Sequence, residues 1–516
     1  MLDKPEARDP GAPDEREWMS DRLRPRDLAF LAAESPSTPM HNATVEIFDP
    51  GESGFDYERL VDLIRDRISF APRYRQRIQA VPGWVANPAW VDDENFDVTY
   101  HVRRSALPRP GSLHQLQELV ARIVSRPLDR SRPLWEMYLV EGLAGGQVAL
   151  LSKSHQVLVD GVVTVDLGQV LLDANAEPKE LGGDEWRAER RPSSTGLVLG
   201  AVRDSISRTT VVDTVRSRTE SVLRHGTAAA ERAGRIANGL TGRRPEWESP
   251  INGHLSQQRR IVTVNTDLAD YRTVRQAHGG SINDVILATL SGALRSWLMA
   301  RTESMGGMRQ IRAVVPVSVI DDGLESNSLG NPIAAHYVDL PIGEASPVVR
   351  LHQVSYSFQA HKDTGRGVAA NRLAGIAGFA PTTFHAIGAR VAAAELRKGF
   401  QLVVTNVPGP QSPLYAAGAR MVATYPVHPL LPGQALAIGV TSYDGRVYYG
   451  VTADPHLLPD VDLLGSCIRE ALDELLDTAT GARTRAPRGR RKSAAKSGSK
   501  APAKPPSKAA LEGGPS

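Results

Sequence analysis

Short apolar runs separated by polar turns predict alternating strands and helices over the first third of the chain. NATVEIFD (residues 42–49) predicts a strand, whereas YERLVDLIRDRI (57–68) and QLQELVARIVSR (115–126) place apolar residues at helical spacing. Two further apolar runs lie in WEMYLVEGLAGGQVALLSKSH (135–155), and the Gly-Gly pair at 145–146 between them predicts a hairpin turn. This mixture indicates an α/β domain.

The same alternation resumes in the second half of the chain. RRIVTVNTDL (259–268) predicts a strand, and SINDVILATLSGALRSWL (281–298) predicts an amphipathic helix of about five turns. RQIRAVVPVSV (309–319) is so rich in apolar residues that we expect a strand buried on both faces. Further strands are expected at 401–408, 435–445 and 446–454, and a terminal helix at 462–477.

The segment between the two halves has a different composition. From Leu197 to Leu240 it is rich in Arg, Ala, Ser and Thr with a weak helical period, which favours a helical crossover. A solvated helix pair is the simpler interpretation, and a membrane-surface helix with an Arg-rich polar face is the alternative. Because 516 residues exceed one ordinary domain, we expect a disordered N-terminus (1–17), an N-terminal domain (18–185), a crossover (186–255), a C-terminal domain (256–480) and a disordered basic tail (481–516).

Charge and composition narrow the functional classes. The chain carries a formal net charge of +3, but residues 481–516 hold ten Lys or Arg and one Glu, so residues 1–480 carry a net charge of −6. We therefore expect no nucleic-acid surface on the folded body, although the tail suits anionic surfaces. No run of roughly 18 apolar residues spans a bilayer, and the charged, Pro-rich start resembles no signal peptide. A single cysteine, Cys467, fits a cytoplasmic protein without disulfides.

Motifs for several common chemistries are missing. The sequence has no G-x-S-x-G elbow, phosphate-binding loop, dinucleotide G-x-G-x-x-G or H-E-x-x-H pattern. What remains is KSHQVLVDGVV (153–163), in which His155 precedes Asp160 and Gly161. A single histidine at a strand end is more often a hydrogen-bonded structural residue than a base, so its neighbours must decide.

Several blocks in a fixed order resemble the bacterial wax ester synthase/diacylglycerol acyltransferase family of CoA-dependent acyltransferases. The resemblance runs from residue 24 to residue 454. It rests on a D-x-x-F-L opening followed by an acid, on P-L-W, on N-D-V-x-L-A and on N-V-P-G-P. The matching residues are Asp27, Phe30, Leu31, Glu34, Pro133, Leu134, Trp135, Asn283, Asp284, Val285 and Asn406 to Pro410.

The resemblance implies two chloramphenicol acetyltransferase-like domains, with mixed sheets flanked by helices and an active-site channel at their interface. Acyl-CoA, the co-substrate, would enter from one side and a diacylglycerol or long-chain alcohol from the other, at a membrane or lipid-droplet surface. No bound cofactor or metal is implied. In the family motif H-H-x-x-x-D-G the second histidine is the general base, and the aspartate shapes the loop. The implied substrate-site residues are Glu34, Trp135, Asn283, Asp284, Asn406, Pro408 and Gly409.

This chain departs from the family at the base position, because the histidine doublet falls on His155 and Gln156. An amide has no useful proton affinity, and general-base catalysis typically contributes on the order of 10²–10⁴-fold. If the strand continues to Gln156, adjacent side chains alternate and His155 faces away from the channel. A local bulge that turns His155 inward is the competing hypothesis.

The remaining motif residues also have simpler interpretations. Trp135 is by default a core aromatic, and Asn283 and Asp284 suit the N-terminus of the long helix. Pro408 and Gly409 make a stiff turn by composition, and Glu34 is otherwise an ordinary acid. His41 and His428 have no ligand-like spacing.

Three functions stay open at this point. The first is an acyl-CoA-dependent O-acyltransferase that makes triacylglycerol or wax ester. The second is a catalytically impaired relative that binds acyl-CoA or neutral lipid as a regulator or partner, which Gln156 favours. The third is an enzyme for an acceptor whose hydroxyl is acidic enough to need no strong base.

Overall fold

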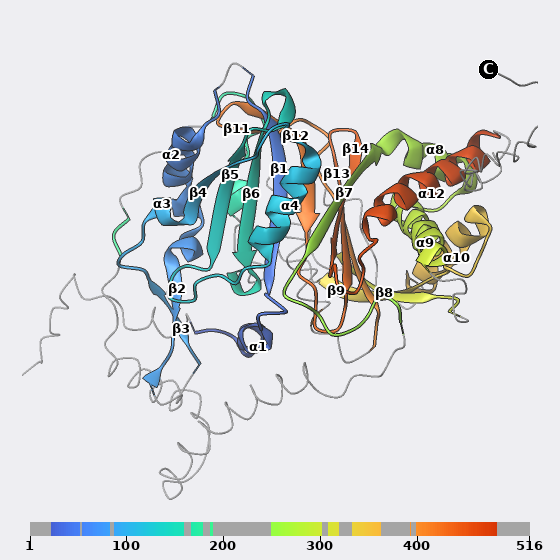
Figure 1. Ribbon diagram of the computed structural model, residues 1–516, viewed down its shortest axis with the longest axis horizontal. Helices are drawn as coiled ribbons and strands as arrows, with labels where there is room; N and C mark the ends of the chain where they lie inside the picture. Colours follow the sequence, from blue (N-terminus) through green and yellow to red (C-terminus); the bar gives the residue numbers. More distant parts are fainter. Residues whose placement is uncertain are drawn as a thin grey trace, which may run out of the picture.

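The computed structural model describes residues 22–51, 54–82, 87–158, 167–178, 186–188, 249–301, 308–318, 333–362, 393 and 399–481. They form two six-stranded mixed sheets, each flanked by helices and lying next to the other (Figure 1). The mixed α/β class is therefore confirmed. The expected crossover helix (197–240), the N-terminal segment 1–17 and residues 482–516 of the tail lie outside the described residues.

The first sheet has the strand order β11-β12-β1-β6-β5-β4, and all neighbours pair antiparallel except β4 and β5. Helices α2, α3 and α4 lie around it, and α1 lies below it in Figure 1. The bounds are α1 (Pro25–Ala33), β1 (His41–Asp49), α2 (Tyr57–Arg67), β2 (Gln76–Gln79), β3 (Ala89–Asp92), α3 (Val98–His101), β4 (Val102–Ala106), α4 (Leu113–Val124), β5 (Trp135–Glu141), β6 (Val148–His155), α5 (Leu167–Val170), β11 (Tyr415–Ala416) and β12 (Ala419–Val427).

The predicted hairpin is present between β5 and β6. Gly145 and Gly146 have φ angles of 77° and 76°, in the left-handed region that glycine enters without steric cost. The strands pair from Val140↔Ala149 to Trp135↔Ser154. On its other side β6 pairs with β1, where His155, the last residue of β6, lies opposite His41.

The second sheet has the order β7-β14-β13-β10-β8-β9, with parallel pairs at β13/β10 and β10/β8. Helices α8, α9, α10 and α12 cover one of its faces (Figure 1). The bounds are β7 (Arg260–Asp267), α8 (Leu268–His278), α9 (Ile282–Arg301), β8 (Ile311–Ser318), β9 (Ile333–Leu340), α10 (Pro347–Lys362), β10 (Leu402–Pro408), β13 (Leu436–Tyr443), β14 (Arg446–Ala453) and α12 (Asp462–Thr480).

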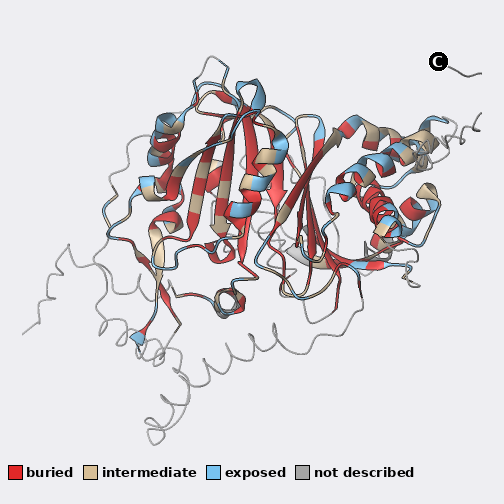
Figure 2. Cartoon of the chain, in the orientation of Figure 1, coloured by how far each residue is buried: buried red, intermediate tan, exposed pale blue. Residues whose placement is uncertain are grey.

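Helix α9 is more deeply buried than its expected amphipathic pattern indicates. Every residue from Asp284 to Leu294 is buried (Figure 2). The physical reason is that α9 contacts α8, α10 and α12 as well as strand β9. Only its C-terminal part, with Ser296 and Met299, reaches solvent.

Strand β12 joins the two halves of the chain. It follows β10 in the sequence, yet it pairs with β1 in the first sheet, with Val45 opposite Tyr425. It also crosses close over β13 and β14, where a Cβ atom on Gly450 would collide with the carbonyl oxygen of Pro426. The expected domain boundaries stay predictions, because the second half of the chain contributes strands β11 and β12 to the first sheet.

Candidate active site

The end of β6 holds the two residues on which the expected chemistry depends. Strand β6 pairs with β1 without interruption from Phe48↔Val148 to His41↔His155. The backbone N–H of Gln156 then donates to the Met40 carbonyl at 2.9 Å, so no bulge intervenes before the 3-10 turn Gln156–Leu158. His155 and Gln156 therefore project to opposite faces of the sheet, as strand alternation predicts.

Both ring nitrogens of His155 face protein groups. The backbone N–H of Val157 donates to Nδ1 at 3.1 Å, and Nε2 lies 3.6 Å from Oε2 of Glu34. Because Nδ1 is an acceptor, the ring proton of the neutral tautomer sits on Nε2, toward the carboxylate. His155 is 1% exposed. This arrangement leaves neither nitrogen directed at the opposite face of the sheet.

Glu34 connects this histidine to a second one. Directly after α1, its Oε1 accepts the backbone N–H of Met40 at 3.2 Å and lies 3.0 Å from Nε2 of His41. Its Oε2 accepts from Nη2 of Arg130 at 2.6 Å. Burial alone would raise the pKa of Glu34, but the rings of His155 and His41 outweigh it and hold the pKa well below the usual range. Burial lowers the pKa of His41 to about 3, so an ionised carboxylate lies beside a neutral His41 ring.

Gln156 lies on the other face, next to an asparagine of β1. Its Nε2 donates to Oδ1 of Asn42 at 3.2 Å, and both residues are buried, at 1% and 7% exposure. Nδ2 of Asn42 is also buried and has no hydrogen-bond partner among the residues that the structure describes. At the position expected to hold a base, the side-chain amide of Gln156 is thus paired with that of Asn42.

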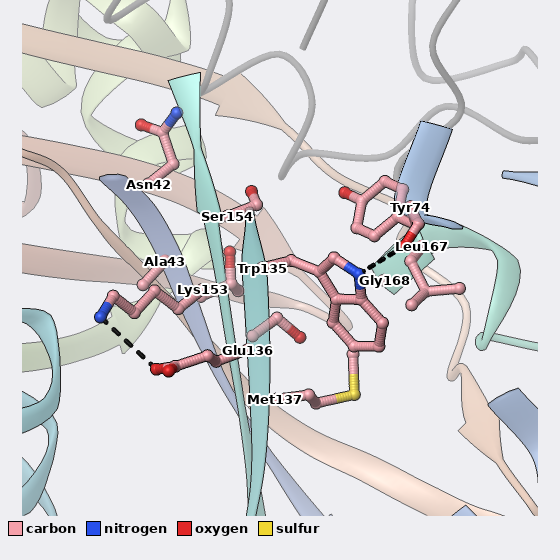
Figure 3. A pocket seen from close by; sticks show the side chains of 12 residues that line it. Asn42, Ala43, Tyr74, Trp135, Glu136, Met137, Lys153, Ser154, Leu167 and Gly168 are labelled. Carbon is pink, nitrogen blue, oxygen red and sulfur yellow. Dashed lines mark hydrogen bonds and ion pairs between the residues drawn. The ribbon is translucent and has the colours of Figure 1, made fainter. Parts of the chain in front are cut away.

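A pocket opens on the Asn42 face of the sheet (Figure 3). The empty space in this pocket is about 400 Å³, part of which is open solvent. Figure 3 shows the indole of Trp135 on the opposite side of the strands from the Lys153–Glu136 ion pair. Paired residues of β1, β6 and β5 form the floor of the pocket in two rows. In that strand order, the first row is Asn42, Ser154 and Trp135, and the second is Thr44, Ser152 and Met137. Tyr74, Leu167 and Gly168 also line the pocket.

Trp135 combines a core position with a place in this pocket. It is 2% exposed, and its Nε1 donates to the Tyr74 carbonyl at 2.7 Å. Its ring stacks on His101, with centroids 4.6 Å apart. The core interpretation and the pocket-shaping interpretation of this residue are therefore compatible.

The expected site residues of the second half form a separate cluster. Nδ2 of Asn406 donates to Oδ1 of Asn283 at 2.9 Å, which ties β10 to the first turn of α9. Asp284 has a helix-end role, because its Oδ2 accepts the Ser281 N–H at 2.8 Å and the Ser281 hydroxyl accepts the Asp284 N–H at 3.2 Å. This reciprocal pairing is a capping box, as the simpler interpretation of Asp284 anticipated.

The turn after β10 is also held by hydrogen bonds. Pro408 ends β10, and the N–H of Gly409 donates to the Ser442 carbonyl at 3.0 Å. Asp160 and Gly161 lie outside the described residues. Among the residues that are described, no group of His, Cys, Asp and Glu side chains is arranged to hold a metal ion, and no helix is long and apolar enough to cross a bilayer.

Comparison with known proteins decides the family. The model of the wax ester synthase/diacylglycerol acyltransferase (WS/DGAT) catalytic domain matches residues 23–286, and the model of the WS/DGAT C-terminal domain matches residues 329–476. The chain belongs to the WS/DGAT family. It is an acyltransferase by family, and the resemblance inferred from the sequence motifs is confirmed.

Individual WS/DGAT relatives agree with this assignment. The chain is 41% identical over 265 residues to a probable diacylglycerol O-acyltransferase (tgs3) of Mycobacterium tuberculosis, covering 50% of this chain and 96% of the relative. It is 32% identical over 469 residues to a putative diacylglycerol O-acyltransferase of the same species, covering 89% and 90%. The solved WS/DGAT structure from Marinobacter aquaeolei VT8 is 25% identical, with a TM-score of 0.62 over 89% of this chain and 100% of that one.

The structure brings some predicted site residues together and adds others. Glu34 lies with His155 on one face of the β6 end, while Gln156 lies on the other face, next to the Trp135 pocket. Asn283 and Asn406 meet in the second half; the functional roles of all these residues stay predictions. Sequence reasoning did not place His41, Asn42 and Arg130 in the site. Asn42 meets Gln156 and Arg130 meets Glu34 across 114 and 96 positions of sequence, and His41 carried no ligand-like spacing.

Proposed function

We propose that this WS/DGAT member is an acyl-CoA-dependent O-acyltransferase whose acceptor is a diacylglycerol or a long-chain alcohol. In this reaction the acceptor hydroxyl oxygen attacks the thioester carbonyl carbon, a new C–O bond forms and the C–S bond breaks. The hydroxyl proton is lost and the CoA thiolate gains one. The products are triacylglycerol or wax ester and free CoA.

Gln156 changes how this reaction runs in the proposed enzyme. Its amide cannot take the hydroxyl proton, so turnover rests on positioning and on hydrogen bonds to the reacting groups. We therefore expect turnover that is slow by about 10²–10⁴-fold relative to the same site with a base. The observation that supports this proposal is the ordered strand end. Nδ1 of His155 accepts from Val157 N–H and its Nε2 points toward Glu34. On the other face, Gln156 donates to the pocket-lining Asn42.

A second candidate function rests on the same geometry. Nδ1 of His155 accepts from Val157, and Nε2 points toward Glu34 on the face away from the pocket. Since Gln156 is no base, a family member that binds acyl-CoA or neutral lipid without turnover fits the described residues as well. Such a protein would act as a partner or regulator of lipid synthesis. The two candidates differ in a single observable, which is the release of CoA.

The proposed substrates also suggest where the protein works. Acyl-CoA and diacylglycerol are both amphiphiles, so we propose that the chain meets them in the cytoplasm at a membrane or lipid-droplet surface.

Acceptor-dependent CoA release tests the proposal. The purified protein is mixed with palmitoyl-CoA and either dispersed diacylglycerol, hexadecanol or no acceptor, and free thiol and ester product are measured together. We expect slow thiol release that matches ester formation and needs an acceptor. Saturable binding of palmitoyl-CoA without ester would instead support the binding protein, and absence of binding would contradict both functions.

A further inference from the structure

Two polar groups in the pocket have no hydrogen-bond partner, in the part of the chain that the structure describes, that explains their burial. Nδ2 of Asn42 and Oγ of Ser152 are buried without a hydrogen-bond partner among the described residues. Both side chains line the pocket beside Trp135. Buried donors without partners destabilise a fold and are rare in native proteins. A ligand atom that accepts from Asn42 would complete the pairing.

The orientation of the Asn42 amide is fixed by its neighbours. Asn42 lies within β1, directly opposite Ser154, and is 7% exposed. Its Oδ1 accepts from Nε2 of Gln156 at 3.2 Å. Since the oxygen accepts from Gln156 and Nδ2 has no hydrogen-bond partner among the described residues, the NH₂ group is the part of this amide that can donate to a ligand.

The pocket around this donor is divided into a polar half and an apolar half. Strands β1 and β6 contribute hydroxyl and amide side chains to the floor, whereas Trp135, Met137 and Leu167 supply apolar surface. Lys153 and Glu136 also line the pocket, but their ion pair lies on the opposite side of the strands from Trp135 (Figure 3). A carbonyl group attached to an apolar chain matches both halves, because its oxygen accepts from the polar side while the chain covers the apolar side.

We propose that Asn42 donates a hydrogen bond from Nδ2 to the carbonyl oxygen of the acyl thioester, and that Gln156 acts as a positioning residue that holds the Asn42 amide in this orientation. The inference rests on the proposed use of acyl-CoA. It assigns to Asn42 the stabilisation of the negative charge that develops on the carbonyl oxygen when the acceptor attacks. A donor held in place before the reaction serves this purpose without reorganisation.

Two unreactive ligands separate this role from turnover. The first is a ketone analogue of palmitoyl-CoA with a methylene between sulfur and carbonyl, and the second is the S-hexadecyl thioether of CoA, which lacks the carbonyl. Calorimetric dissociation constants are compared for each protein. We expect the unmodified protein to bind the ketone roughly 3- to 10-fold more tightly, the range of one net hydrogen bond.

Variants then assign this preference to the amide pair. In Asn42→Leu, which keeps the size and removes the donor, the two ligands should bind equally, and Asn42→Ala provides the same test if the leucine variant does not fold. Gln156→Leu should lose part of the preference, because the Asn42 amide is no longer held. Asn95→Ala, at an exposed position, should keep all of it.

The outcomes distinguish the inference from the proposed function. Equal binding of the two ligands to the unmodified protein, or an unchanged preference in both Asn42→Leu and Asn42→Ala, would overturn the role of Asn42 while leaving acyl transfer intact. Failure of either ligand to bind at all would overturn the use of acyl-CoA, and the inference with it.

Discussion

Two consecutive residues, His155 and Gln156, have entirely different surroundings. His155 lies among ionisable groups, with Glu34 and His41 on its face of the sheet, while Gln156 pairs with the neutral amide of Asn42. The alternation of a strand was enough to predict this division. It also removes the structural basis for a bulge that would turn His155 toward the pocket.

The partners of these residues could not be predicted in the same way. Neither His41 nor Asn42 is part of a motif with recognisable spacing. Asn42 meets Gln156 across the β1/β6 pair, 114 positions away in the sequence. The pocket that Asn42 lines also includes Trp135 and Tyr74, which come from other segments. Long-range pairing of this kind is not encoded in local periodicity.

The buried His41 predicts acid sensitivity. Its pKa is about 3 in the folded protein, against about 6.5 in the unfolded chain, so the unfolded chain binds the proton first as the pH falls. Stability is therefore complete above about pH 6.5 and is lost as the pH falls toward 3, by about 1.4 kcal/mol per pH unit for one proton. Urea denaturation at several pH values should show that His41→Gln weakens this dependence by about one proton.

The window and the control keep this prediction specific. Glu34 is almost fully ionised in both states above about pH 5.5, so the comparison is made between about pH 5.5 and 6.5. His114→Gln replaces a histidine whose side chain is 57% exposed and should leave the slope unchanged. If the free energy of unfolding changed with pH equally in the unmodified protein and in His41→Gln, the proposed role of His41 would be contradicted.

Among the elements, α4 depends on a lysine from the neighbouring strand. Nζ of Lys153 donates to the carbonyls of Ile123 and Arg126 at 3.1 and 2.6 Å, at the C-terminal end of this helix. It also lies 3.6 Å from Oε2 of Glu136. A cation there adds a charged donor to the carbonyls at the helix end, where Ile123 also accepts the Arg126 N–H, and it complements the helix dipole.

Removing this buried cation should destabilise the first half of the protein. Lys153→Met is expected to lower the free energy of unfolding by about 2–4 kcal/mol, because buried carbonyls and Glu136 lose a charged partner. Chemical denaturation measures the change, and Arg122→Met, at an exposed position of α4, serves as the control. Equal stability of the two variants would show that Lys153 does not hold the helix.

Elements with a strong local pattern were predicted well. The strands β1, β7, β8, β10, β13 and β14 and the helices α2, α4, α9 and α12 all begin and end within about three residues of the expected ranges, and β5 and β6 lie within the expected hairpin (135–155). The elements that the sequence patterns did not reveal are α1, β2, β3, α3, β4, α5, α8, β9, α10, β11 and β12. Several of these are short or have mixed polarity, and β12 in particular is buried by a neighbour from the other half of the chain, which its own residues do not reveal.

The two sheets depend on each other in the whole molecule. Strand β12 completes the first sheet and crosses the second, and a small core between them contains Phe30 and Met40 from the first half with Phe400, Val403 and Leu431 from the second. The resemblance to a known family led us to expect two similar halves. It did not predict that β11 and β12, from the second half of the chain, would complete the first sheet. Neither half should therefore fold as a fully independent unit.

A glycine at the crossing tests this dependence. Gly450→Ala would place a methyl group against the Pro426 carbonyl, which is rigid backbone, so we expect a loss of about 1–3 kcal/mol or more and a weaker joining of the halves. Differential scanning calorimetry should show a lower melting temperature and a broadened or split transition. Gly253→Ala, where the added methyl meets only the Leu457 side chain, should have a smaller effect, and the reverse order would contradict the crossing as a critical contact.

The most direct test of the account is the rate of acceptor-dependent CoA release from palmitoyl-CoA by the unmodified protein, Gln156→His and His155→Ala. We predict slow release by the unmodified protein and an increase of about 10²-fold or more in Gln156→His, because a base then faces the pocket. His155→Ala should lose stability, and any folded fraction should keep a slow rate. A rate abolished in folded His155→Ala, together with no gain in Gln156→His, would show that His155 is the base and would contradict the account.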